Sequence, residues 1–112
     1  MDIPRRNASL LVQLRTRHVP LNKYLHRIKR ADSPLCPACE GGSESVLHFL
    51  VTCPAYKPLR RPLHHALKRQ SHSLNVLLND PAAFRPLFHF INRTGRFHDT
   101  FGNLALPPEK EE

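Results

Sequence analysis

Four residues near the middle of the chain have the types and the spacing of metal ligands. Cys36 and Cys39 form a C-x2-C pair, and His48 and Cys53 extend it to the pattern C-x2-C-x8-H-x4-C. Zinc takes four ligands in a tetrahedral arrangement, and thiolates and imidazoles are its usual ligands in structural sites. A C-x2-C turn directs two sulfur atoms at one centre. We therefore expect these four residues to bind one structural zinc ion.

Two other interpretations of these residues are open. In the first, the thiols and His48 are ordinary core and polar side chains. In the second, Cys36 and Cys39 form a redox pair, although such pairs usually have a thioredoxin-like strand–helix context that this sequence lacks. All three cysteines belong to the motif, and an odd number argues against a closed disulfide framework. Thiols of this kind favour a reducing, intracellular setting, in the nucleus or the cytoplasm.

Residues that could perform catalysis are sparse. Metal-assisted phosphoryl chemistry usually needs clustered carboxylates, whereas the nine acidic residues are scattered and three of them fall in the last four positions. The sequence contains no Gly-rich phosphate loop and no G-x-S-x-G element. Zinc would use all three thiols, which leaves no free nucleophile. The sequence therefore predicts a protein that is not an enzyme.

The charge of the chain favours a polyanionic partner. Lys and Arg total 17 against nine Asp and Glu, a formal net charge of +8, and such an excess displaces counterions from phosphates. A solvated basic surface without a dedicated partner is the alternative. We predict weak, sequence-tolerant binding to RNA or single-stranded DNA, because contacts to phosphates carry no sequence information. No signal peptide and no membrane-spanning run is expected.

The predicted nucleic-acid contacts form two groups on either side of the metal motif. The first group is Arg15, Arg17, Lys23, Arg27, Lys29 and Arg30, and the second is Arg60, Arg61, Lys68 and Arg69. The two groups would make one surface if their basic sides face the same way. Tyr24 and Tyr56 either stack on bases or pack at the edge of the core.

The elements that position these residues are predicted to be short helices, because eleven prolines divide the chain and no strand-like alternation is present. We expect a mainly α fold, a small helical domain with short helices arranged around one zinc-binding loop. Residues 1–7 are predicted to be an N-terminal extension, 8–97 the domain with its zinc motif at 36–53, and 98–112 a disordered tail.

Local signals place the helices within this domain. Asn7 or Ser9 is expected to cap a helix through Leu14, and Pro20 to open a helix with the apolar stripe Leu21, Tyr24, Leu25 and Ile28. A Gly41-Gly42 turn is expected to precede a short helix capped at Ser43 or Ser45. A regular helix should start near Pro62, and a last helix should run from Pro81 to Gly95.

The stretch LLVQLRTRHVPLNKYLHRIKRADSPLCPACEGGSESVLHFLVTCPAY resembles the C-terminal end of fungal non-LTR (LINE-type) retrotransposon polyproteins, downstream of the reverse transcriptase and RNase H domains. The later stretch LLNDPAAFRPLFHFINRTGRF is similar to the closing helix of that family, so the resemblance covers roughly residues 8–97. The residues that match the family pattern are Leu14-Arg15-Thr16, His18, Leu21-Asn22, Tyr24-Leu25, Asp32-Ser33-Pro34, Cys36, Cys39, His48 and Cys53-Pro54.

Arg17 departs from this pattern, because the family commonly has Gly there. If that Gly ends a helix, Arg17 must adopt a left-handed conformation or the helix must end differently. The resemblance covers no endonuclease, polymerase or RNase H part, so it implies a truncated element remnant that carries only a zinc knuckle-like, nucleic-acid-binding end. Retroelement proteins are the other expected partners. The alternatives are a zinc-stabilised structural or protein-interaction module without nucleic-acid binding, and a fragment without a selected function.

Overall fold

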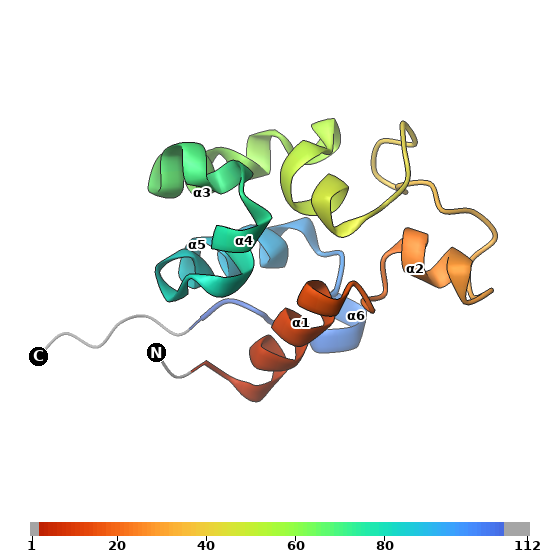
Figure 1. The fold of residues 1–112 in the computed structure, drawn as a ribbon, viewed down its shortest axis with the longest axis horizontal. Coiled ribbons are helices and arrows are strands. Elements are labelled where there is room, and N and C mark those ends of the chain that lie inside the picture. The colour runs from red at the N-terminus through yellow and green to blue at the C-terminus, as the bar shows by residue number, and fades with distance from the viewer. Residues whose placement is uncertain (1–2, 107–112) are drawn as a thin grey trace, which may run out of the picture.

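The computed structural model describes residues 3–106, which form a small, mainly helical fold (Figure 1). The six α-helices of this part are α1 (Arg5–Thr16), α2 (Asn22–Arg27), α3 (Arg61–Leu67), α4 (Leu74–Asn79), α5 (Pro81–Thr94) and α6 (His98–Phe101). A π-helical turn, η1 (His48–Thr52), and the 3-10 turns η2 (Pro54–Tyr56), η3 (Pro58–Arg60) and η4 (Lys68–His72) connect them. One isolated β-bridge, between Leu35 and Ser43, is the only strand-like pairing in the described range. The predicted mainly α domain is confirmed.

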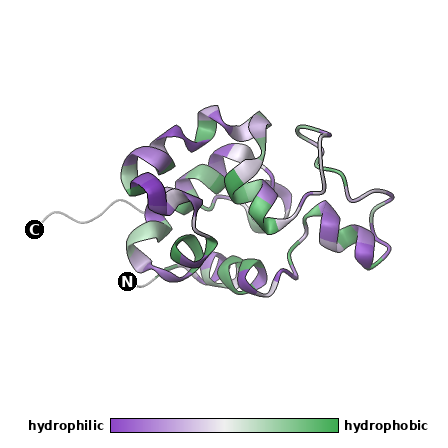
Figure 2. Cartoon of the chain, turned by 45° about the horizontal axis from the view of Figure 1, so that its top comes forward, coloured by the Kyte–Doolittle hydropathy of each residue, from purple (hydrophilic) through white to green (hydrophobic). Residues whose placement is uncertain are grey.

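The hydrophobic core forms where α3 and α4 pack against α5, with α1 packed on α4 and Phe49 of η1 against Phe90 of α5. Six side chains of α5 are buried, and the fully buried Phe49 of η1 and Leu63 of α3 lie in the same cluster. Figure 2 shows hydrophobic residues concentrated in these packed helices, whereas α2 is mostly hydrophilic. Of the predicted stripe in α2, Leu21 is buried but Ile28 is 40% exposed. The second helix therefore contributes little to the core and projects from it with the loop that follows (Figure 1).

The prediction that Asn7 or Ser9 caps the first helix is wrong. It starts at Arg5 after Pro4, without a side-chain cap. Asn7 is buried inside the helix, and its Nδ2 donates to the carbonyl of Leu104 at 2.8 Å. At the other end Arg17 adopts φ 66° and ψ 8° and its N–H donates to the Leu14 carbonyl. Arg17 therefore takes the left-handed conformation, which is costly for any residue except glycine.

The last long helix follows its predicted signals. Asp80 caps α5 by accepting a hydrogen bond from the N–H of Ala82 at 3.0 Å, and Pro81 occupies the first turn. Gly95 ends the helix with φ 70°. Because Pro81 lacks an N–H that the first turn would leave unpaired anyway, it fits this position without loss.

The prediction that 98–112 is a disordered tail and 1–7 a separate extension is wrong for the described residues. Residues 98–101 form α6, and Leu104 is buried. The N–H of Leu104 donates to Asn92 Oδ1 at 3.0 Å, while its carbonyl accepts from Asn7. Two side-chain amides from α1 and α5 thus hold this segment against the core. The predicted disorder of residues 107–112 lies outside the described range.

Candidate metal centre

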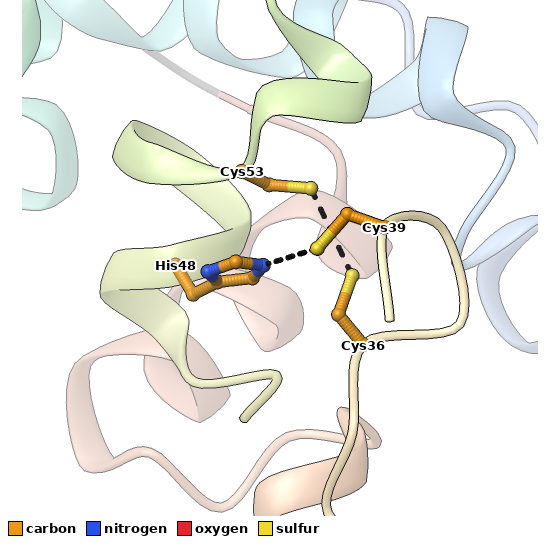
Figure 3. Close-up of side chains that lie close together, drawn as sticks. All are labelled: Cys36, Cys39, His48 and Cys53. Carbon is orange, nitrogen blue, oxygen red and sulfur yellow. Dashed lines mark hydrogen bonds between the residues drawn. The ribbon is translucent and has the colours of Figure 1, made fainter. Parts of the chain in front are cut away.

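The side chains of Cys36, Cys39, His48 and Cys53 meet at one point (Figure 3). Their ligand atoms all lie within 4.8 Å of one another. Cys36 Sγ and Cys53 Sγ are 3.8 Å apart, and Cys39 Sγ is 3.3 Å from His48 Nε2. Three thiols and an imidazole at such distances can hold one metal ion. The predicted clustering of these four side chains is confirmed.

The two cysteines of the C-x2-C pair lie on a tight turn that backbone hydrogen bonds fix. The N–H of Cys36 donates to the Gly42 carbonyl at 2.8 Å, and the N–H of Glu40 donates to the Cys36 carbonyl at 2.9 Å. The left-handed position of this turn is Glu40, with φ 55°, rather than either residue of the predicted Gly41-Gly42 turn. The N–H of Gly41 instead points at Cys39 Sγ, 3.3 Å away.

The other two ligands come from the two ends of η1. Ser45 Oγ accepts a hydrogen bond from the N–H of His48 at 3.0 Å, which confirms Ser45 as a helix cap. The N–H of Cys53 donates to the His48 carbonyl at 2.7 Å, a π-type bond that spans five residues. In a regular α-helix, residues five apart point about 140° away from each other around the axis. The wider π turn brings Cys53 back toward the side of His48, so both face the turn that carries the other cysteines.

Arg60 supports the end of η1, and its predicted role as a nucleic-acid contact is wrong. The side chain is only 3% exposed. Its guanidinium donates to the carbonyls of Phe49, Leu50 and Cys53 at 3.1, 2.9 and 2.7 Å. These carbonyls lie at a helix end, where intrahelical partners are missing. The guanidinium also lies over the Phe90 ring, 5.4 Å from its centroid.

The four ligands differ in their surroundings. Cys36 and Cys53 are fully buried, whereas Cys39 and His48 are partly exposed. The backbone N–H of Gly41 lowers the pKa of the Cys39 thiol below its ordinary value. Burial raises the pKa of the Cys53 thiol to about 11. A metal ion must therefore displace a firmly held proton from Cys53 to bind here. Since four protein groups complete a tetrahedral site, a metal ion held here would have no coordination position open for a substrate.

Glu44 is a second supporting residue, and it is not among the residues that the sequence pattern predicts. Its side chain is fully buried and accepts hydrogen bonds from Arg96 Nε and Nη2 at 2.8 and 2.7 Å. Its Oε1 also accepts from the N–H of Asn22 at 2.7 Å. Glu44 thereby ties α2 and the segment just after α5 to the metal-binding loop. Its position inside the cysteine motif was the available signal, but its partner Arg96 is 52 residues away.

The remaining predicted contacts are exposed but lie in two places. Nine of the ten residues, all except Arg60, have exposed side chains. Figure 1 places α2, which carries part of the first group, at the opposite end of the longest axis from α3, which carries part of the second. The members of the two groups that lie on α2 and α3 therefore form two separate basic surfaces. Tyr56 packs edge-on against Phe49 and Phe90, with centroids 5.6 and 6.3 Å away, so it belongs to the core boundary.

Comparisons of the chain with protein-family models, with curated proteins and with solved structures find no match. The described part contains no helix of the length and apolar character that crossing a membrane would require.

Proposed function

We propose that the chain is a zinc-binding, nucleic-acid-associated module that has no catalytic activity of its own. The observation that carries the zinc assignment is the geometry of the four ligands. Zinc–sulfur bonds of about 2.3 Å at a tetrahedral angle separate two sulfur atoms by about 3.8 Å, and Cys36 Sγ and Cys53 Sγ are 3.8 Å apart. Soft thiolate ligands favour zinc over magnesium or calcium. A closed Cys3His set is typical of structural zinc.

The net charge and the two basic surfaces support the nucleic-acid part of the proposal. The formal charge is +8, and both basic surfaces are exposed to solvent. Contacts from an exposed basic surface go to phosphates rather than to bases, so binding to RNA or single-stranded DNA is expected to be weak and tolerant of sequence. The resemblance to the end of a LINE-type polyprotein points the same way. On this proposal the chain is a remnant of such an element, with retroelement proteins as further partners.

A structural or protein-interaction module is the second candidate, and exposed apolar side chains favour it. Val12, Ile28, Leu35 and Leu47 are 55%, 40%, 45% and 47% exposed. A partner protein that covers them would gain apolar burial, although single exposed apolar residues are also ordinary. Zinc would keep the same role in this candidate, and nucleic-acid binding would be absent.

Two measurements on the purified full chain test the proposal. Metal analysis is expected to find one zinc per chain, and Cys39→Ser to lower both the zinc content and the thermal transition, because metal binding contributes folding free energy. A protein without zinc whose transition is unchanged by Cys39→Ser refutes the metal assignment. Binding to oligouridylate and oligothymidylate is then measured at two salt concentrations. A zinc-loaded protein that binds neither at low salt is an interaction module. Primer extension and hybrid cleavage are expected to be absent.

A further inference from the structure

A groove of about 360 Å³ lies between α2 and the segment 44–47 that leads into η1. Three cationic side chains line it, those of Arg17, Lys23 and Arg27. One carboxylate lines it as well, that of Glu44, but this side chain is fully buried and paired with Arg96 at 2.7 Å. The groove therefore presents positive charge to any ligand that enters it.

Apolar and aromatic groups complete the walls. Leu47, 47% exposed, and the buried Val46 lie on one side, and the half-buried Tyr24 lies on α2. The Tyr24 ring stacks on His18, with centroids 5.1 Å apart and an interplanar angle of 27°. An aromatic ring beside cations suits single-stranded nucleic acid, because a base stacks on the ring while the cations meet its phosphates. An acidic peptide would use the cations, but its carboxylate side chains offer no aromatic ring to stack on Tyr24.

Arg17 reaches this groove from a position where an arginine is unfavourable for folding. Its φ of 66° is a left-handed conformation that glycine adopts without strain. The helix end needs only its backbone N–H, which donates to the Leu14 carbonyl. Within the described part of the chain its guanidinium makes no hydrogen bond, and its side chain is exposed. Strained residues of this kind are enriched at functional sites.

Both walls of the groove are fixed by the metal-binding loop. Glu44 accepts hydrogen bonds from the N–H of Asn22, at its side chain, and from the N–H of Lys23, at its carbonyl, 3.1 Å away. Val46 and Leu47 directly precede the ligand His48. A metal ion that anchors His48 thus holds one wall, while Glu44 holds α2 against it.

We propose that this groove binds one nucleotide of single-stranded RNA or DNA, with the base against Tyr24 and Leu47 and the phosphate at Arg17 and Arg27. The proposal depends on the nucleic-acid association proposed above and identifies where it occurs. The second basic surface, at Arg61, Lys68 and Arg69, then adds only long-range attraction.

The test compares Arg17→Gly with Lys68→Gly in the zinc-loaded full chain. Both variants lose one positive charge, and both put glycine where φ is positive, 66° and 54°, so neither is expected to unfold the domain. The probe is a short fluorescein-labelled oligouridylate followed by anisotropy. Arg17→Gly is expected to weaken binding about 10-fold and to lower the salt slope by about 0.7, the loss of one phosphate contact. Lys68→Gly should stay within about twofold of the parent, because it makes no direct contact.

Tyr24→Leu separates the base contact from the charge. It should weaken binding about fivefold or more and leave the salt slope unchanged, because stacking does not release counterions. Equal losses of oligonucleotide affinity in the two glycine variants, or parental affinity in Tyr24→Leu, overturn the proposed groove site but leave the proposed function standing. Displacement of the probe by poly-glutamate at equal charge overturns it too, since the site would then recognise any polyanion. A parent that shows no salt-dependent binding refutes the proposed function itself.

Discussion

Replacement of Arg60 tests whether this side chain supports the end of η1, where Cys53 lies. The guanidinium is buried, and it donates to three carbonyls, those of Phe49, Leu50 and Cys53. Arg60→Met keeps the volume of the stem and removes all three donors. Arg60→Lys keeps the positive charge, but a single ammonium cannot reproduce the planar fork of the guanidinium. Both variants should therefore damage the end of η1, where Cys53 is held.

The expected magnitude follows from the carbonyls that lose their partners. Leaving a buried acceptor unsatisfied costs about 1–3 kcal/mol. Backbone relaxation and entering water will satisfy some of the three carbonyls. We therefore expect the free energy of unfolding to fall by about 3–5 kcal/mol, similar to breaking a buried charged network. Small domains have a total stability of about 5–15 kcal/mol, so the loss should be easily measured. Since Arg60 bonds the carbonyl of the ligand Cys53, zinc affinity should fall roughly 10–100-fold, as for other residues that orient a metal ligand.

Urea unfolding of the zinc-loaded protein gives the stability, and competition with a chelator gives the zinc affinity. We expect Arg60→Lys to resemble Arg60→Met in both assays. Parental stability and zinc affinity in both variants would refute the supporting role. If Arg60→Lys kept parental stability while Arg60→Met bound oligouridylate more weakly, Arg60 would be a phosphate contact after all.

Three further predictions concern the proton on Cys53 and the hydrogen bonds that hold Leu104. Burial raises the pKa of Cys53 to about 11, so zinc binding at pH 7 should release the proton of this thiol, which a pH-indicator dye would detect. Zinc affinity should also fall as the pH falls. Zinc binding without proton release contradicts this prediction. In the metal-free protein the same raised pKa should lower the thermal transition between about pH 9 and 11, where the unfolded thiol loses its proton first. Asn7→Ala should cost about 1–2 kcal/mol and speed amide exchange in residues 98–106; unchanged exchange would show that another contact holds this segment.

The metal ligands were predictable because their signal is local. A C-x2-C pair and the cap at Ser45 are short-range features, and both appear as expected. The π turn that aligns His48 with Cys53 has no comparable signature, since it differs from an α turn by a single residue. Sequence spacing therefore identified which residues meet but not the backbone that brings them together.

Long-range contacts explain the predictions that were wrong. Arg60 precedes Arg61 in a basic stretch, and nothing local distinguishes the buried arginine from the exposed one. Its burial depends on three carbonyls that precede it by seven to eleven residues and on Phe90 of α5. The segment after α6 likewise has a composition typical of a tail, but Asn7 and Asn92 hold both backbone groups of Leu104. Side-chain amides that join distant helices leave no periodic pattern.

At several positions with left-handed backbone conformations, this chain has a residue other than the glycine that would favour folding. Outside glycine, positive φ values occur at Arg17, Lys29, Glu40 and Lys68 among the described residues, and three of these four are cations. Glycine would satisfy each backbone position with less strain. At Arg17 the side chain lines a groove whose wall continues into His48, so the strained cation and the candidate metal centre border the same groove. If folding alone had shaped this position, Arg17→Gly should raise stability and change nothing else. A gain in stability together with a loss of oligonucleotide binding is the outcome that only a binding role explains.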